Sequence, residues 1–299
     1  MSEHHHHHVS GKNLFLTIVL NVIITISQVV GGILSGSLAL LSDAMHNFSD
    51  VLALVIAYGA NRLAARPNTQ GKTFGYKRAE ILATLFNASV LIGIGIFLIV
   101  ESFHKFYHPE IINSVWVIAL GVLSIVLNAV SVLLIKEDAH HNMNIKAAYI
   151  HLLTDVMTSV AVVLGGLLMY YFQLYWVDPA VSLLIAAYLI WASVGLVRES
   201  SGVLMQFAPK DIELQKVSEE ISKIPQISNV HHMHLWQLDD HKIYLEAHLD
   251  FTQNLSLEAS HEILDFLEES LKKNFGISHT TFQCEYNRCD EKEMIKRSR

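Results

Sequence analysis

Cysteine and charge are both scarce in this chain of 299 residues. The two cysteines, Cys284 and Cys289, stand close together near the end, so the sequence lacks a disulfide framework and predicts reduced cytosolic thiols. Only 16% of the residues are charged, whereas 52% are hydrophobic and the mean hydropathy is +0.35. These values exclude an ordinary soluble protein of this size.

The few charges are unevenly distributed. The first 200 residues hold 10 Lys or Arg and 11 Asp or Glu, whereas residues 201–299 hold 11 and 17. This asymmetry predicts a membrane domain followed by an acidic soluble domain. An acidic domain argues against nucleic acid as a partner and suits metal cations better.

Long apolar runs dominate the first two thirds of the chain. A helix that spans the lipid core needs about 20 mostly apolar residues. Six windows meet this condition: 14–34, 38–60, 81–100, 115–135, 147–172 and 177–197. The sequence therefore predicts a polytopic α-helical membrane protein with six transmembrane helices in a lipid bilayer.

Positive charges predict the orientation of these spans, because Lys and Arg accumulate in cytoplasmic loops. Only Lys105 falls on one side of the membrane. Nine cations fall on the other side: Lys12, Arg62, Arg66, Lys72, Lys77, Arg78, Lys136, Lys146 and Arg198. Both termini are therefore expected in the cytoplasm.

The last third alternates between helical and strand patterns. Helices are predicted at 211–224 and 256–275, and strands at 229–238, 242–251 and 278–286. This order predicts a small cytosolic α+β domain of the αββαβ, ferredoxin-like kind, which pairing with a second copy would help to stabilise.

The chain is expected to divide into four regions. They are a cytosolic N-terminal tail, a six-helix transmembrane domain, the cytosolic α+β domain and a charged C-terminal tail, at 1–12, 13–205, 206–290 and 291–299. The run His4–His8 in the first region is interpreted as either native or an expression tag.

Two of the spans each carry a His and an Asp four residues apart, His46 with Asp50 and His151 with Asp155. Residues i and i+4 share a face of a helix, so each pair points an imidazole and a carboxylate in one direction. Facing each other, the pairs would supply the four ligands of a tetrahedral Zn²⁺. Because a protonated imidazole cannot bind metal, protons and Zn²⁺ would compete for this site.

A structural role is the alternative to a metal site for these polar residues. Helix-packing histidines that hydrogen-bond across the bundle explain one polar residue more easily than two matching pairs. Asp43 is interpreted as either an acceptor behind the ligands or a helix-start residue near the outer surface, and the second interpretation is preferred. Asn47 is expected to pack or to form hydrogen bonds rather than bind metal.

Four stretches in this order, SDAMHNFSD, TFGYKRAE, HHNMNIKAAYIHLLTD and VDPAVSLLIA, resemble the zinc-transporting branch of the cation diffusion facilitator family. The resemblance runs from Lys12 to Glu285 and implies a homodimeric Zn²⁺/H⁺ antiporter, not an enzyme, that exports metal from the cytosol. It implies that the metal lies between the second and fifth helices, on the four ligands named above. It favours Zn²⁺, with Cd²⁺ or Co²⁺ as the other candidates.

The resemblance also implies a second Zn²⁺ site in the cytosolic domain, which would stabilise the dimer rather than transport metal. Its candidate ligands are His234, His248, His261, Gln283 and Glu285, with His232, Cys284 and Cys289 as possible additional ligands. His232 and His234 are two residues apart on a predicted strand and are expected on the same face. Surface or core histidines without metal are the alternative.

Other classes of function make different predictions. A metal-sensing membrane protein would act through its cytosolic domain and would not need His46 or Asp155. An intramembrane metalloenzyme would need a general base and an open coordination position, and the sequence contains no HExxH motif. A channel would not need a closed four-ligand site. Short loops and compact length favour a prokaryotic inner membrane.

Overall fold

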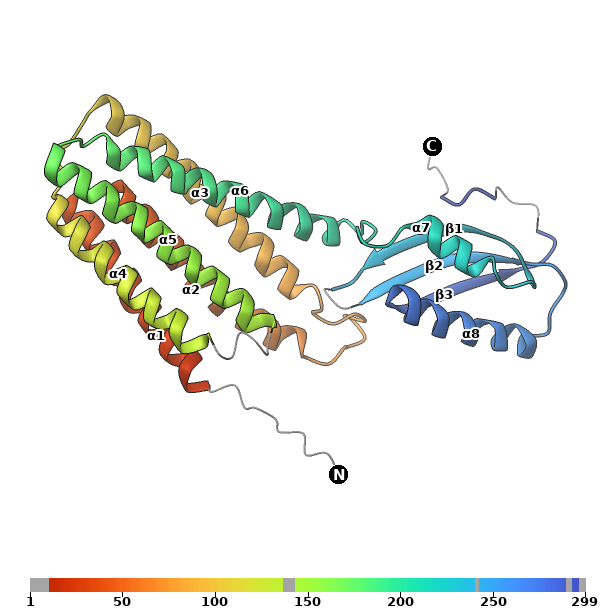
Figure 1. The fold of residues 1–299 in the computed structure, drawn as a ribbon. Coiled ribbons are helices and arrows are strands. Elements are labelled where there is room, and N and C mark those ends of the chain that lie inside the picture. Colours follow the sequence, from red (N-terminus) through yellow and green to blue (C-terminus); the bar gives the residue numbers. More distant parts are fainter. Residues whose placement is uncertain (1–10, 137–142, 240–241, 289–291, 296–299) are drawn as a thin grey trace. The chain divides into compact units, whose positions relative to one another are not determined.

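The computed structural model describes residues 11–136, 143–239, 242–288 and 292–295 (Figure 1). Six long helices come first: α1 (Gly11–Ser35), α2 (Leu38–Ala64), α3 (Ala79–Tyr107), α4 (Ser114–Ile135), α5 (Met143–Phe172) and α6 (Val177–Leu204). Each is long and apolar enough to cross a membrane, so the six predicted spans are confirmed.

The helices α2 and α5 lie beside each other and are the most buried of the six spans, with buried shares of 47% and 39%. Their buried polar residues include Asp43 and Asn47 of α2, and Asp155 and Ser159 of α5. Polar side chains in a membrane protein favour the inside of the bundle, away from lipid. The two helices that shield their side chains best are therefore the two that carry the His–Asp pairs.

Close helix contacts in the bundle depend on glycine. A Cβ atom at Gly31 of α1 would lie 1.8 Å from Cδ1 of Leu120 in α4, and one at Gly121 of α4 would lie 2.6 Å from Cγ2 of Val163 in α5. Small residues permit such close approach, and the resulting packing contacts hold helices together where lipid weakens the hydrophobic effect between them. The helix α4 therefore packs closely against both α1 and α5.

The first turn of α2 is capped partly from another helix. The Oγ atom of Ser37 accepts a hydrogen bond from the amide of Leu40 at 3.1 Å. The carboxylate of Asp178, in the first turn of α6, accepts from the amides of Leu38 at 2.7 Å and Ala39 at 3.3 Å, and the hydroxyl of Ser37 also donates to it. These bonds satisfy amides that have no acceptor within the helix and fix the outer end of α2 against α6.

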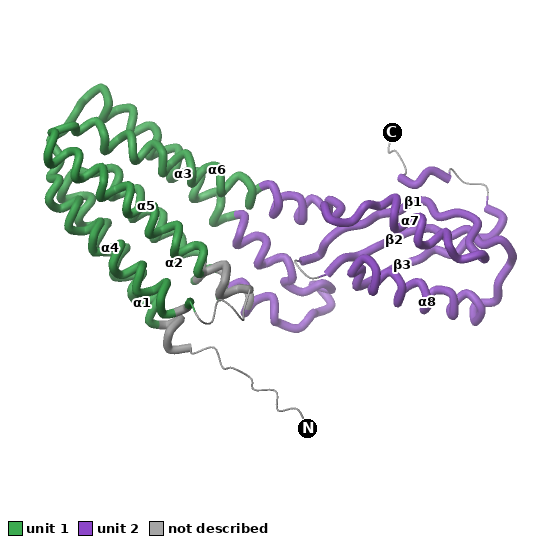
Figure 2. Tube along the Cα trace, viewed as in Figure 1, with its two compact units in different colours: residues 1–58, 86–197 green, residues 59–85, 198–299 purple. Residues whose placement is uncertain are grey.

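Two compact units divide the chain, one formed by residues 1–58 and 86–197 and the other by residues 59–85 and 198–299 (Figure 2). The inner ends of α2, α3 and α6 and the loop between α2 and α3 therefore group with the C-terminal domain. Within this second unit, the ring of Phe74 in that loop meets Tyr244 edge to face, with centroids 5.9 Å apart.

The C-terminal domain has the predicted αββαβ order. Its elements are α7 (Leu214–Ile221), β1 (Ile227–Gln237), β2 (Ile243–Phe251), α8 (Leu257–Phe275) and β3 (Ile277–Glu285). The sheet order is β1–β2–β3, with β1 antiparallel and β3 parallel to β2. Val217 and Ile221 of α7, Leu267 of α8, and Leu245 and Leu249 of β2 belong to one buried core that joins the helices to the sheet. The predicted α+β class is confirmed.

An irregularity in β1 changes which side chains share a face. The register with β2 shifts between His231, which pairs with His248, and His234, which pairs with Glu246. His232 lies within the shift and has a positive φ of 49°, a conformation that is uncommon outside glycine. Because of this shift, His231 and His232 both approach His248, with ring centroids 5.3 Å and 4.8 Å away, whereas His234 lies exposed opposite Glu246.

Replacement of Asp178 tests the cap on α2. Asp178→Ala leaves two amides of the first turn without their acceptor, and hydrogen bonds to a charged group contribute about 1.5–3 kcal/mol each, so the melting temperature of the purified protein should fall clearly. Asp178→Asn keeps one carbonyl acceptor and should lose less. Equal melting temperatures for the wild type and both variants would contradict this role.

Candidate metal centre

The structure brings together the two predicted His–Asp pairs. Across the interface between α2 and α5, Nε2 of His46 lies 3.3 Å from Oδ1 of Asp155, and Nε2 of His151 lies 3.1 Å from Oδ2 of Asp50. Along each helix, Nδ1 of His46 is 3.6 Å from Oδ2 of Asp50, and Nε2 of His151 is 3.9 Å from Oδ2 of Asp155. The four side chains thus form a closed ring of alternating imidazoles and carboxylates.

The size of this ring fits a tetrahedral ion. Each residue offers one ligand atom, and the four atoms all lie within 4.8 Å of one another. Bonds of about 2.0 Å at tetrahedral angles separate ligand atoms by roughly 3.3 Å. Neighbouring residues around the ring approach to 3.1–3.9 Å, with both nitrogens of His46 and both oxygens of Asp155 in use, so reorientation of these side chains would bring one atom of each residue onto a single ion.

The polar atoms of this centre are poorly satisfied by the protein itself. Both ring nitrogens of His46 and both carboxylate oxygens of Asp155 are buried and make no well-aligned hydrogen bond within the described residues. A buried carboxylate without such bonds is costly in a low-dielectric interior, and a cation is the partner that it requires. A divalent metal would supply the positive charge and the ligand bonds that these buried atoms lack.

Exposure is unequal among the four predicted ligands. The side chains of His46 and Asp155 are 9% and 0% exposed, whereas those of Asp50 and His151 are 19% and 41% exposed. Asp50 follows His46 along α2 and His151 precedes Asp155 along α5, so both exposed ligands lie toward the side that the positive charges assign to the cytosol. The inner side of the site is the more accessible side.

Behind the predicted ligands lies a second polar group, which we call the Asp43 cluster: Gln28, Asp43, Asn47, Thr158 and Ser159. Asp43 is fully buried six residues into α2, so the preferred expectation of a helix-start residue near the outer surface is wrong. Its carboxylate accepts hydrogen bonds from Nε2 of Gln28 at 2.5 Å, Oγ1 of Thr158 at 2.8 Å and Oγ of Ser159 at 3.0 Å. Asn47 donates to Gln28 at 2.9 Å, as expected of a hydrogen-bonding residue.

The cytosolic domain carries a separate group of histidines. His231, His232 and His248 each offer a nitrogen within 4.8 Å of the others. Two carboxylates border this group: Nδ1 of His248 lies 2.9 Å from Oε1 of Glu285, and Nδ1 of His231 lies 3.6 Å from Oδ2 of Asp250. His231 is completely buried and Glu285 nearly so. Imidazoles with flanking carboxylates are a fitting donor set for Zn²⁺.

Cations near the C-terminus approach the same carboxylates. Nη1 of Arg288 lies 3.0 Å from Oε1 of Glu285, and Nζ of Lys292 lies 2.8 Å from Oδ2 of Asp250. The amide of Met233 donates to the carbonyl of Met294 at 2.8 Å, so this segment also pairs with the irregular part of β1. The acidic side of the histidine group is thereby neutralised within the chain.

The other predicted cytosolic ligands occupy different places. Gln283 pairs with His248 across the sheet and donates to Glu285 at 2.7 Å, so it lies at the group. His234 is exposed opposite Glu246, and His261 is exposed on α8, 3.9 Å from Asp265. Cys284 is exposed on β3, and partial burial raises the pKa of its thiol, which disfavours the metal-binding thiolate.

Two predicted features lie outside the described residues, namely Cys289 and the run His4–His8. Sequence reasoning missed His231 and Asp250 as members of the cytosolic group. Simple strand alternation gave no reason to choose His231 over its neighbour, because the register shift that admits both residues depends on tertiary pairing.

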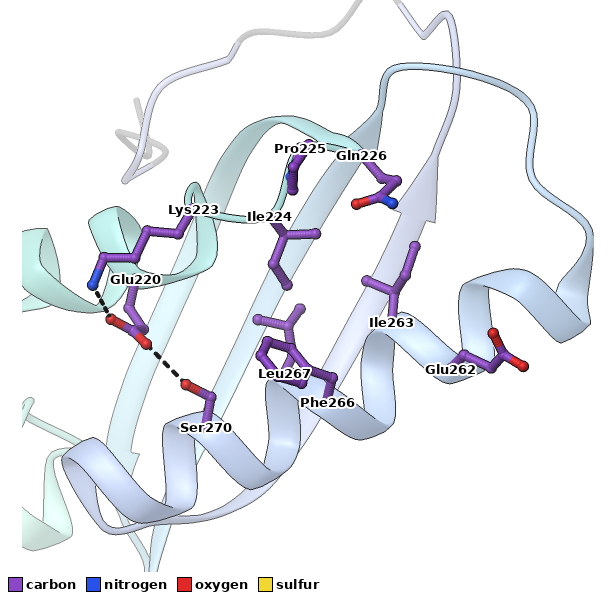
Figure 3. A pocket seen from close by; sticks show the side chains of 10 residues that line it. All are labelled: Glu220, Lys223, Ile224, Pro225, Gln226, Glu262, Ile263, Phe266, Leu267 and Ser270. Atoms are coloured by element: carbon purple, nitrogen blue, oxygen red, sulfur yellow. Dashed lines mark hydrogen bonds and ion pairs between the residues drawn. The ribbon is translucent and has the colours of Figure 1, made fainter.

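A hollow of about 440 Å³ lies elsewhere in the domain, between α7 and α8 (Figure 3). Ile224, Ile263 and Leu267 contribute apolar side chains to it. At its edge Glu220 accepts hydrogen bonds from Lys223 at 2.6 Å and Ser270 at 2.8 Å, and the bond from Lys223 lowers the pKa of Glu220. Its lining contains no histidine or cysteine, so it does not extend the metal-binding chemistry.

Two family models match this chain. One, described as the cation efflux transmembrane domain, matches residues 14–205, and the other, described as the cytoplasmic domain of cation efflux proteins, matches residues 209–287. The chain therefore belongs to the cation efflux family, as its motifs indicated. It is an integral membrane transporter of cations rather than an enzyme.

Individual relatives are similar over almost their whole length. The cation efflux system protein CzcD of Alcaligenes sp. (strain CT14) is 32% identical over 98% of this chain and 93% of its own. A cadmium, cobalt and zinc/H⁺–K⁺ antiporter of Bacillus velezensis is 32% identical, with coverage of 94% and 91%. The zinc transporter ZitB of Pectobacterium atrosepticum is also 32% identical, with coverage of 97% and 91%.

The cytosolic histidine group predicts which substitutions affect metal binding there. In protein that carries Asp50→Ala, so that the membrane site is disabled, His231→Ala should weaken Zn²⁺ binding by at least about tenfold. The matched change His234→Ala should leave binding unchanged, because His234 is exposed beyond the register shift. Equilibrium dialysis of the purified protein measures both affinities, and a larger loss from His234→Ala would show that the sequence-based ligand set is the correct one.

Proposed function

We propose that this protein exports Zn²⁺ from the cytosol in exchange for protons, with Cd²⁺ and Co²⁺ as possible further substrates. One observation supports this proposal above all, the closed ring of His46, Asp50, His151 and Asp155 between two buried spans. Two carboxylates match the double charge of the ion, and two imidazoles add nitrogen ligands that Zn²⁺ accepts readily.

The donor set suits transport better than storage. The sequence has no cysteine within any of the six helices, and thiolates would hold zinc more tightly than carboxylates and imidazoles do. Histidine titrates near neutral pH, and its protonated form cannot bind metal. A proton can therefore displace the ion without any other change in the site.

The names of the relatives support the same substrates. ZitB is named as a zinc transporter, and the Bacillus relative is named as an antiporter of cadmium, cobalt and zinc against H⁺ and K⁺. Imidazole and carboxylate ligands do not by themselves separate Zn²⁺ from Cd²⁺ or Co²⁺. We therefore assign the metal class from the ligands and the exchange with protons from the titratable imidazoles.

We propose two conformations for this exchange. In the inward-open state, which the greater exposure of Asp50 and His151 supports, the site takes Zn²⁺ from the cytosol and loses protons. In the outward-open state, protons from outside reach His46 or His151 and expel the ion. Occupancy by metal or by protons shifts the population between the two states.

The assembly that we propose is a homodimer in a bacterial inner membrane with both termini in the cytoplasm. The match to a cytoplasmic domain model and the bacterial relatives support this placement, and we retain the boundaries 13–205 for the transport domain and 206–290 for the metal-binding and dimerisation domain. The histidine group on β1 and β2 would hold structural Zn²⁺. His261 is exposed on α8, so a role for it in that site would require a second copy of the chain.

A second candidate function is metal sensing through the cytosolic domain, which the group of His231, His232 and His248 favours. The two functions differ in what they require. A sensor needs the cytosolic histidines and tolerates loss of the membrane ligands, whereas an exporter shows the opposite pattern.

Substitutions at the membrane site test export directly. Asp50→Ala and His151→Ala each remove one of four ligands, so pH-driven Zn²⁺ uptake into everted vesicles should fall to about one hundredth of the wild-type rate or less. Glu101→Ala and His104→Ala, on the outer half of α3, are matched controls and should transport normally. If the membrane-site variants accumulate Zn²⁺ at the normal rate, the proposed function is wrong.

The cytosolic site should contribute less to transport. His248→Ala removes one member of the histidine group without touching the spans, so the protein should bind less Zn²⁺ per chain but retain a measurable part of its transport rate. Binding stoichiometry and vesicle uptake measured on the same preparation check this expectation. Complete loss of uptake would instead place the essential metal-binding event in the cytosolic domain.

A further inference from the structure

The carboxylate of Asp43 has no role as a zinc ligand, yet it is among the most protected groups in the protein. Its side chain is 0% exposed within a membrane-spanning helix, where an ionised carboxylate is stable only with strong partners. Its partners come from two other helices: Gln28 from α1, and Thr158 and Ser159 from α5. Asp43 therefore joins α2 to α1 and to α5 at one point.

Neighbouring groups hold these donors in place. Asn47 donates to the Oε1 atom of Gln28, which turns the Nε2 atom of the same amide toward Asp43. Ser124 of α4 lies 2.9 Å from the hydroxyl of Ser159. All of these described partners are neutral, and the nearest titratable residues along the two helices are His46 on α2 and Asp155 on α5.

The contacts between α2 and α5 place the Asp43 cluster on the outer side of the metal ring. Asp43 contacts Thr158, His46 contacts Asp155, and Asp50 contacts His151, so the pairs run in opposite directions along the two helices. The most exposed ligands lie at the inner end of this series, and the Asp43 cluster lies at the outer end. The cluster therefore joins the helices where an outward path to the ring would have to open.

The protonation state of Asp43 decides how many of these bonds can form. An ionised carboxylate only accepts hydrogen bonds, which suits the three donors that point at it. A protonated carboxyl donates one bond itself and accepts more weakly, above all at its hydroxyl oxygen, so the bonds from the three donors weaken. Both hydroxyls of α5 have another partner, because Thr158 also donates to the carbonyl of Asp155 at 2.9 Å and Ser159 contacts Ser124. They can leave Asp43 at little cost in free energy.

We propose that Asp43 is a positioning residue that holds the outer side of the transport site closed while it is ionised and lets it open when a proton from outside reaches it. This inference rests on the proposed exchange of Zn²⁺ for protons, and it adds a proton-responsive group that does not touch the ion. Protons then act twice, because they displace zinc from the imidazoles and also favour the outward-open state.

Asp43→Asn tests this role, because the amide keeps the shape of a protonated carboxyl and cannot ionise. In proteoliposomes, acidification of the outer-face compartment from about pH 7.5 to about pH 5.5 should speed zinc exchange by about fivefold or more in the wild type and by less than about twofold in Asp43→Asn. Zn²⁺ affinity in detergent should stay within about threefold of the wild type, since all four ligands remain. Glu101→Gln, the same chemical change on α3, should respond to pH as the wild type does.

A second variant keeps the carboxylate and weakens only the ionised form. Thr158→Val removes one donor, so protonation of Asp43 becomes easier and the half-maximal response should move to a higher outer pH. A wild-type pH response in Asp43→Asn would overturn the inference, and so would a parallel loss of Zn²⁺ binding, which would make Asp43 a support for the ligands. Absence of any pH response in the wild type would instead overturn the proposed exchange itself.

Discussion

A charged or polar side chain in the core of a membrane is stable only when another group satisfies it, and this constraint determines the centre of the transporter. The four proposed ligands satisfy one another only partly, since His46 and Asp155 retain buried atoms without well-aligned hydrogen bonds. Asp43, three residues before His46, has three donors. The first arrangement is suited to receive a cation, whereas the second already holds its helices together.

The helix α2 therefore has different roles at its outer end and along the rest of its length. Its outer end is fixed by Asp178 and the Asp43 cluster, Asp50 lies near its middle, and its inner end groups with the unit that contains the cytosolic domain. The site is most exposed on that inner side. A transporter that alternates between two sides needs such an asymmetry in each state, because a site open to both sides at once would allow metal and protons to leak.

Much of this organisation could be predicted from the sequence. Spacing of four residues in two apolar helices predicted which side chains meet, because helical geometry alone puts His46 near Asp50 and His151 near Asp155. The environment of Asp43 could not be predicted, since its partners come from α1 and α5 and no local pattern reveals them. His231 was missed for a related reason, because an irregular register in β1, set by pairing with β2, decides which histidines meet His248.

The proposed transport requires that Zn²⁺ binds between α2 and α5 on two imidazoles and two carboxylates. X-ray absorption at the zinc edge tests it most directly, on protein that carries His231→Ala and His248→Ala so that the cytosolic group is removed. We expect four nitrogen and oxygen ligands at about 2.0–2.1 Å, with the scattering pattern of two imidazoles and none from sulfur. A spectrum with about six oxygen ligands, or with sulfur at about 2.3 Å, would contradict it.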